Sequence, residues 1–104
     1  MPKIKVAKKS DIAKGKVIPV KVGESEVAIY HTQNDEFYAT SDICTHEKCN
    51  LSYEGGKLEG YEAECDCHGS KFDIRTGKVV LPPAVEDLKT YKLTTEGEDI
   101  LVED

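Results

Sequence analysis

Two short stretches contain most of the residues that could bind a metal, namely Cys44-Thr45-His46-Glu47-Lys48-Cys49 and Cys65-Asp66-Cys67-His68-Gly69-Ser70. All four cysteines and two of the three histidines of the chain lie in them. Thiolates and imidazoles are suited to zinc, copper or iron–sulfur clusters. With 18 residues between His46 and Cys65, we interpret the two stretches as loops of one metal site.

The order of the ligand types favours iron. A zinc finger usually takes two Cys from one turn and two His from a helix. Here each stretch offers one Cys and one His, as Cys-x-His in the first and Cys-x-x-His in the second. Two facing loops of this kind can bring both thiolates to one metal ion and both imidazoles to a second. This is the arrangement of a 2Fe–2S centre in which two His replace two Cys on one iron.

Cys44, His46, Cys65, His68 and Gly69 together resemble the ligand signature of the Rieske 2Fe–2S family, C-x-H…C-x-x-H-G. The resemblance spans roughly residues 36–93 and implies one Rieske-type 2Fe–2S cluster, held by those two Cys and two His. It includes the strand before the first loop, the strand and turn after the second, and a proline-rich loop, at residues 37–40, 71–77 and 81–84.

The resemblance also implies roles for residues beside the ligands. In the high-potential branch of the family, found in cytochrome bc-type complexes, a Ser and a Tyr hydroxyl donate hydrogen bonds to the cluster. Ser70 and Phe72 stand at these positions, so the Ser is retained and the Tyr hydroxyl is missing. Donors aimed at the cluster raise its potential, and we therefore expect a potential between the family's extremes.

Two further pairs of residues match features of the family. The high-potential branch has a disulfide between its ligand loops, and Cys49 and Cys67 stand at those positions. Pro82 and Pro83 match the loop that covers the cluster, so we expect them, with Ser70, to tune it.

Other interpretations of the same residues remain open. Cys49 and Cys67 could be thiols, because cytosolic disulfides are uncommon. A four-Cys cluster could use the C-x₄-C spacing of Cys44 and Cys49, but Ser52 stands where its third Cys is needed. A structural zinc site is a remote alternative. Ser70 could only brace its loop, and the two prolines could form a plain stiff turn.

Short β-rich segments with turn signals every eight to twelve residues predict an all-β fold, an antiparallel sandwich or barrel. Pro19 lies inside one such segment and predicts an edge strand or a bulge. Residues 10–15 predict a turn or one helical turn. At 104 residues the chain is expected to form a single domain, 1–104. The resemblance implies a Rieske-type fold whose cluster-binding subdomain, at about 42–84, is carried on antiparallel sheets.

Composition and the absence of targeting signals limit which binding partners and which cellular location we expect. A net charge of −6 argues against nucleic acid and for a basic protein surface. No stretch approaches the ~18 apolar residues of a membrane span. The first residues show neither an apolar signal region nor a twin arginine. If the chain is complete, we expect a cytoplasmic monomer.

We therefore expect a soluble one-electron carrier, a Rieske-type ferredoxin that passes electrons from a flavoprotein reductase to an oxygenase or another redox acceptor such as a cytochrome. An enzyme is disfavoured, because a terminal oxygenase needs a further 2-His-1-carboxylate iron site and only His31 is left over. We interpret His31 as an ordinary surface residue. The alternative function is a fragment or soluble relative of the cytochrome bc-type Rieske subunit.

Overall fold

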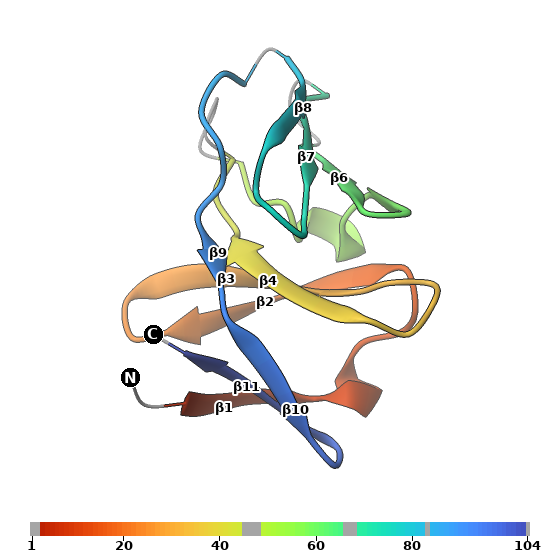
Figure 1. Ribbon diagram of the computed structural model, residues 1–104, viewed down its shortest axis with the longest axis vertical. Helices are drawn as coiled ribbons and strands as arrows, with labels where there is room; N and C mark the ends of the chain where they lie inside the picture. The colour runs from red at the N-terminus through yellow and green to blue at the C-terminus, as the bar shows by residue number, and fades with distance from the viewer. Residues whose placement is uncertain (1–2, 45–48, 66–68, 83, 104) are drawn as a thin grey trace.

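The computed structural model describes residues 3–44, 49–65, 69–82 and 84–103. In these residues the chain forms three antiparallel sheets, stacked along the long axis of the molecule (Figure 1). The prediction of an all-β fold is confirmed. The helices in the described part of the chain are single 3₁₀ turns, η1 (Lys9–Asp11) and η2 (Tyr53–Gly55). None of them is long and apolar enough to cross a membrane.

The sheet at the base joins the first and last strands. Lys3 lies opposite Glu103, so segments from the two ends of the sequence are side by side. Ile4 and Leu93 both pair with Val102, and these three apolar side chains share one face of the sheet, as cross-strand partners do. The strands, in the order β1-β11-β10, are β1 (Lys3–Lys8), β11 (Asp99–Glu103) and β10 (Leu93–Glu96).

The central sheet lies between the other two. Alternate residues of its second strand face opposite sides: Val27 and Ile29 belong to the core toward the base, whereas Ala28 and Tyr30 belong to the core on the other side. Pro19 lies in the edge strand, as predicted, where the missing N–H costs no ladder hydrogen bond. The strands, in the order β2-β3-β4-β9, are β2 (Lys16–Val22), β3 (Ser25–His31), β4 (Phe37–Ser41) and β9 (Thr90–Tyr91).

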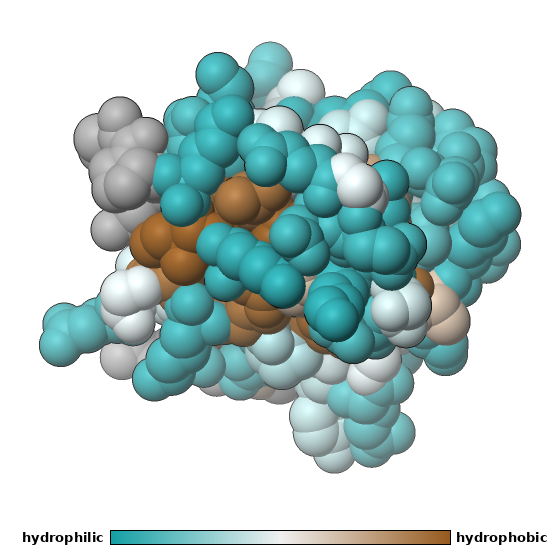
Figure 2. Space-filling model, turned by 90° about the horizontal axis from the view of Figure 1, so that it is seen from below, coloured by the Kyte–Doolittle hydropathy of each residue, from teal (hydrophilic) through white to brown (hydrophobic). Residues whose placement is uncertain are grey.

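The core between the base sheet and the central sheet remains partly open. Ile4, Val6 and Leu93 are only partly buried where they pack against it. Seen from below, an apolar area lies among hydrophilic side chains (Figure 2). Because Figure 1 places the third sheet at the opposite end of the molecule, this area is remote from the ligand loops.

The third sheet is small and carries the second ligand loop between two of its strands. Its inward-facing residues include Ala63 and Phe72, which are opposite each other and nearly inaccessible to solvent. Two residues after Phe72, the buried Ile74 packs with Val17 and Tyr30 of the central sheet. The third sheet therefore rests on the central one. Its strands, in the order β5-β6-β7-β8, are β5 (Leu58–Glu59), β6 (Glu62–Glu64), β7 (Lys71–Asp73) and β8 (Val79–Leu81).

Polar contacts lie on both sides of this junction, and one of them, from Tyr61 to Glu36, crosses it. Tyr30 is fully buried, and its hydroxyl lies 2.8 Å from that of Thr40. Burial raises the pKa of Tyr30, so its hydroxyl stays neutral in this hydrogen bond. At the surface, Tyr61 donates a hydrogen bond to Glu36 of the β3–β4 connection. The guanidinium of Arg75 lies 4.2 Å from the centre of the Tyr61 ring, a cation–π contact between residues that flank β6 and β7.

Asp73 and Arg75 form an ion pair whose effect on stability depends on pH. Arg75 donates to both carboxylate oxygens, at 2.9 and 3.1 Å, and these bonds lower the pKa of Asp73. A lowered folded-state pKa adds stability above the unfolded value of about 3.9, and this stability is lost as pH falls through the folded value. We expect Asp73→Asn to destabilise the protein by about 0.5 kcal/mol at neutral pH, since the pair is partly exposed. Thermal unfolding at pH 7 and pH 3 should show this difference shrinking in acid; an equal difference at both would contradict the assignment.

Candidate metal centre

Two of the four predicted ligands lie in one small apolar core. Cys44 is 3% exposed and Cys65 is 1% exposed. Both pack with Leu51, Phe72 and other buried residues in a core beneath the ligand loops. Two buried thiols that converge from separate loops are a donor set that fits one thiolate-ligated iron.

The two loops are closed in the same way. The Cys44 N–H donates to the Cys49 carbonyl over 2.9 Å, and the Cys65 N–H donates to the Ser70 carbonyl over 2.7 Å. In each loop a buried Cys therefore bonds to the residue five positions later. At the end of the second loop Gly69 has a φ of +78°, which favours glycine because it has no Cβ. The chain thus presents two matched loops, each beginning at a thiol.

Regular strands fix where these loops begin. The first loop follows β4, and the short bridge Ile43↔Asn50 joins its two sides. The second lies between β6 and β7, whose register places Glu64 opposite Lys71. His46 and His68, the predicted imidazole ligands, lie outside the described residues, as does Cys67. The described residues alone hold no group of three or more His, Cys, Asp or Glu that could bind a metal. Neither the full ligand set nor the Cys49–Cys67 disulfide is tested, and both stay predictions.

Ser70 does more than brace its own loop. It is fully buried, and its Oγ accepts a hydrogen bond of 3.0 Å from the Ala84 N–H. This bond ties the second ligand loop to the proline-rich segment, where Pro82 is exposed and Pro83 lies outside the described residues. Because the Ala84 amide uses an acceptor site of the hydroxyl, the Ser70 proton can still be donated.

Two hydrogen bonds between the residues that flank the proline-rich segment close it into a loop. The Leu88 N–H donates to the Gly77 carbonyl over 2.7 Å, and the Val79 N–H donates to Asp87 over 3.0 Å. Ala84 and Leu88 are buried in the same core as the two thiols. The segment therefore covers that core, as the predicted covering loop should.

The interpretation of His31 as a surface residue is wrong. Its side chain is buried and stacks on Phe37 with ring centres 4.1 Å apart. Nδ1 lies 2.7 Å from the Ile12 carbonyl and Nε2 lies 2.6 Å from Asp35. The sequence pattern places His31 at a strand end but does not reveal that Ile12 and Asp35 fold over it. His31 joins the β1–β2 and β3–β4 connections to the end of β3 and is no ligand candidate.

Sequence reasoning also missed Asp42 and Ser52, which flank the first loop. Asp42 is completely buried, and its carboxylate accepts a hydrogen bond of 2.7 Å from the Ser52 hydroxyl. The available signal was an Asp followed ten residues later by a Ser on the two sides of a metal loop. That signal is weak without knowledge of where the loop closes.

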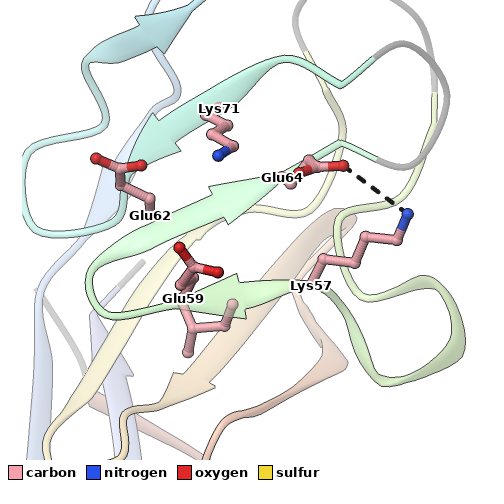
Figure 3. Close-up of a pocket in the computed structure, with 6 residues that line it drawn as sticks. Lys57, Glu59, Glu62, Glu64 and Lys71 are labelled. Carbon is pink, nitrogen blue, oxygen red and sulfur yellow. Dashed lines mark ion pairs between the residues drawn. The ribbon is translucent and has the colours of Figure 1, made fainter.

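A shallow hollow of about 240 Å³ lies on the outer face of the third sheet, beside the second ligand loop (Figure 3). Its charged side chains include the pair Lys57–Glu64, at 3.8 Å, while Glu59 lies opposite Glu62 on adjacent strands. The lining has both signs of charge, as we expect for a solvated rim. It is formed by Lys57, Leu58, Glu59, Glu62, Glu64 and Lys71.

Comparison with known proteins decides what this site is. The family model of the Rieske [2Fe-2S] domain matches residues 2–92. The chain belongs to the Rieske [2Fe-2S] domain family. Its cofactor is therefore one Rieske-type 2Fe–2S cluster, and the zinc and four-Cys interpretations are set aside.

Relatives of known role are similar over nearly the whole chain. The chain is 44% identical to the biphenyl dioxygenase ferredoxin subunit of Pseudomonas sp. (strain KKS102), over 89% of this chain and 84% of that protein. The ferredoxin of carbazole 1,9a-dioxygenase from Nocardioides aromaticivorans IC177 superposes with a TM-score of 0.90 at 29% identity, covering 98% of this chain and 97% of the other. A ferredoxin-sized chain from a complex of reduced oxygenase and oxidized ferredoxin in carbazole 1,9a-dioxygenase gives 0.87 at 34% identity, covering 96% of this chain and 100% of the other. The Rieske-type fold is confirmed.

Proposed function

We propose that this chain is the ferredoxin component of a multicomponent oxygenase system, a one-electron carrier between a flavoprotein reductase and a terminal oxygenase. The two matched loops with buried thiols in one core are the observation that carries this proposal. Two relatives with named roles serve dioxygenases, and one similar structure is a complex of a ferredoxin with its oxygenase. The cluster supplies one-electron redox chemistry when bound, and the chain itself changes no substrate.

The proposed ligands are Cys44 and Cys65 for one iron and His46 and His68 for the other. The positions of the two thiols support the first half of this set, since both are buried and both begin a closed loop. Replacing two thiolates by two neutral imidazoles makes the centre less negative, so an added electron is less opposed. Rieske centres accordingly have potentials of roughly −150 to +300 mV, against about −400 mV for plant-type ferredoxins.

We also propose a Cys49–Cys67 disulfide between the loops, within a cluster-binding subdomain of about 42–84 in a single domain, 1–104. Cys49 packs against the core that contains both proposed thiolate ligands. A bridge from this position would hold the two loops together when the cluster is reduced or lost. A cytoplasmic location and a monomeric state remain predictions from the sequence.

Ser70 and Phe72 are the residues that we propose to set the potential. Ser70→Ala removes a hydroxyl whose proton can be donated toward the cluster, and we expect the midpoint potential to fall. Phe72 is fully buried in the core with both thiols, and Phe72→Tyr would add a donor there and raise the potential. One hydrogen bond that differs by about 1.4 kcal/mol between redox states moves a one-electron potential by about 59 mV. Redox titrations give both midpoint potentials. If both variants differed from the wild type in the same direction, these roles would be contradicted.

The partner would approach over the proline-rich segment. Within it or next to it in sequence, Val80, Leu81 and Val85 are 47%, 44% and 88% exposed, and exposed apolar side chains gathered in one region mark protein–protein contacts. A contact here would bring the partner to the core that holds both thiols, since Ala84 of this segment and Leu88, four residues after it, are buried in that core.

Electron transfer to an oxygenase tests the proposed function. The reduced protein is mixed with the purified oxygenase component of a biphenyl dioxygenase system, and its reoxidation is followed under anaerobic conditions by stopped flow. We expect reoxidation to accelerate in proportion to oxygenase concentration. The proposal would fail if the oxygenase had no effect while a soluble c-type cytochrome oxidised the protein rapidly, a result that would favour the cytochrome bc-type alternative.

A further inference from the structure

The first ligand loop is closed where residues 42–44 lie beside residues 49–52, and we call this closure the neck of the loop. Backbone hydrogen bonds alone hold the neck only in part. The Cys44 N–H bonds to the Cys49 carbonyl, and the Leu51 N–H donates to the Asp42 carbonyl over 2.8 Å. Between them, Ile43 and Asn50 form one isolated bridge. Such a short ladder has few bonds to resist opening.

The Asp42 side chain completes the neck. Its Oδ1 accepts from the Ser52 N–H over 2.8 Å, and its Oδ2 accepts from the Ser52 hydroxyl at 2.7 Å and from Asn50 Nδ2 at 2.8 Å. Asp42 is 0% exposed and its two bonds to Ser52 are buried, so they are shielded from water, whereas the bond from Asn50 is partly buried. One side chain on the incoming strand thus holds two residues of the outgoing one.

An aspartate satisfies all of these donors, and an asparagine or glutamate fits them less well. The Ser52 N–H can only donate, and it approaches a different carboxylate oxygen from the Asn50 NH₂. The Asn50 NH₂ also faces the Glu26 carboxylate at 3.3 Å, so a flipped Asn50 would turn its carbonyl oxygen toward Glu26. An Asn at position 42 would therefore turn its own NH₂ toward a donor. A Glu would add a methylene to a fully buried site, which overpacks it.

The carboxylate also brings a charge. Its donors in the described residues, Ser52 and Asn50, are all neutral, and Asp42 lies two residues before the thiol of Cys44. A negative charge buried near a redox centre opposes the arrival of an electron, and the opposition is strong where the surroundings exclude water.

We propose that Asp42 is a positioning residue for the cluster: it locks the neck of the first ligand loop, slows loss of the cluster, and lowers the midpoint potential through its charge. This inference rests on the proposed cluster ligands. The second loop has a different anchor, the bond from Ala84 to Ser70, so the effect should be confined to the first loop.

Holoprotein variants test the inference. We expect Asp42→Asn to lose iron to a chelator about tenfold faster than the wild type, as outer-shell substitutions at metal sites do, and to have a higher midpoint potential. Ser52→Ala keeps the charge and loses one hydrogen bond, so it should speed iron loss without raising the potential. Asp99→Asn is the matched control, because it removes a charge from the base, where Asp99 pairs with Lys5 at 3.2 Å.

The outcomes separate the inference from the proposed function. If the wild type holds no Rieske cluster, the proposed function fails. If it holds one, and Asp42→Asn and Ser52→Ala both lose iron at the rate of Asp99→Asn, the positioning role is overturned. Should Asp42→Asn not fold, Ser52→Ala decides the loop-locking role. Amide hydrogen exchange of the wild-type holoprotein is a second test of the loop-locking role. We expect strong protection at the Ser52 N–H, and rapid exchange there would contradict this role.

Discussion

Replacing Cys65 with Ser should yield a protein that folds but holds almost no iron or sulfide. Cys65 is 1% exposed and shares a core with Cys44, so no other side chain can take its place without rearranging that core. A serine hydroxyl is a hard, weakly acidic donor and a poor substitute for a thiolate on iron. We expect cluster content to fall at least tenfold, measured as iron and acid-labile sulfide per chain.

Cys49→Ser is the matched control. It makes the same chemical change in the core of the two thiols, outside the proposed ligand set. Because it also breaks the proposed bridge to Cys67, we expect this variant to assemble a cluster but to lose it faster than the wild type. If Cys65→Ser held as much iron and acid-labile sulfide per chain as Cys49→Ser, Cys65 would not be a ligand and the two-Cys, two-His assignment would be wrong.

Gly77→Ala should be the most destabilising alanine substitution at a turn of the third sheet. Gly77 has a φ of +80°, and a Cβ there would lie 2.1 Å from the Leu88 carbonyl oxygen. That atom is backbone, and the Leu88 N–H is itself bonded to the Gly77 carbonyl. The clash must therefore push away the segment that covers the cluster core. We expect a loss of about 3–5 kcal/mol, or a fall in Tm of roughly 15 °C or more.

Gly60→Ala separates the clash from the backbone strain. Gly60 has a φ of +61°, and nothing lies within 4 Å of a Cβ built there. Its cost should be only the strain of a left-handed residue, about 1 kcal/mol. Thermal unfolding of both variants gives the comparison, and equal losses would mean that the contact with Leu88 does not hold the covering segment.

The sequence was sufficient for the fold class and for the location of the site. Short β-rich segments separated by turn signals predict strands, and Pro19 correctly marks an edge. The spacing of Cys44 and Cys65 within their two stretches led to one site, and the structure brings both thiols into one core. Each of these signals lies within a short stretch of the sequence, so it can be recognised without knowledge of the tertiary structure.

What the sequence could not provide depends on contacts between distant segments. The burial of His31 requires Ile12, which lies 19 residues away, to present its carbonyl. The bond from Ala84 to the hydroxyl of Ser70 spans 14 residues. The fit of Asp42 to its donors appears only when the neck of the loop is closed. Such contacts follow from tertiary packing and leave no periodic signal.

The most direct test of the two-Cys, two-His cluster is a redox titration of the purified, metal-replete protein near neutral pH, monitored by electron paramagnetic resonance. We predict no signal from the oxidised protein and a strongly anisotropic Rieske-type signal on reduction. Its midpoint should lie within the Rieske range of roughly −150 to +300 mV and away from both extremes. Absence of that signal after full reduction would contradict the cluster assignment on which this account rests.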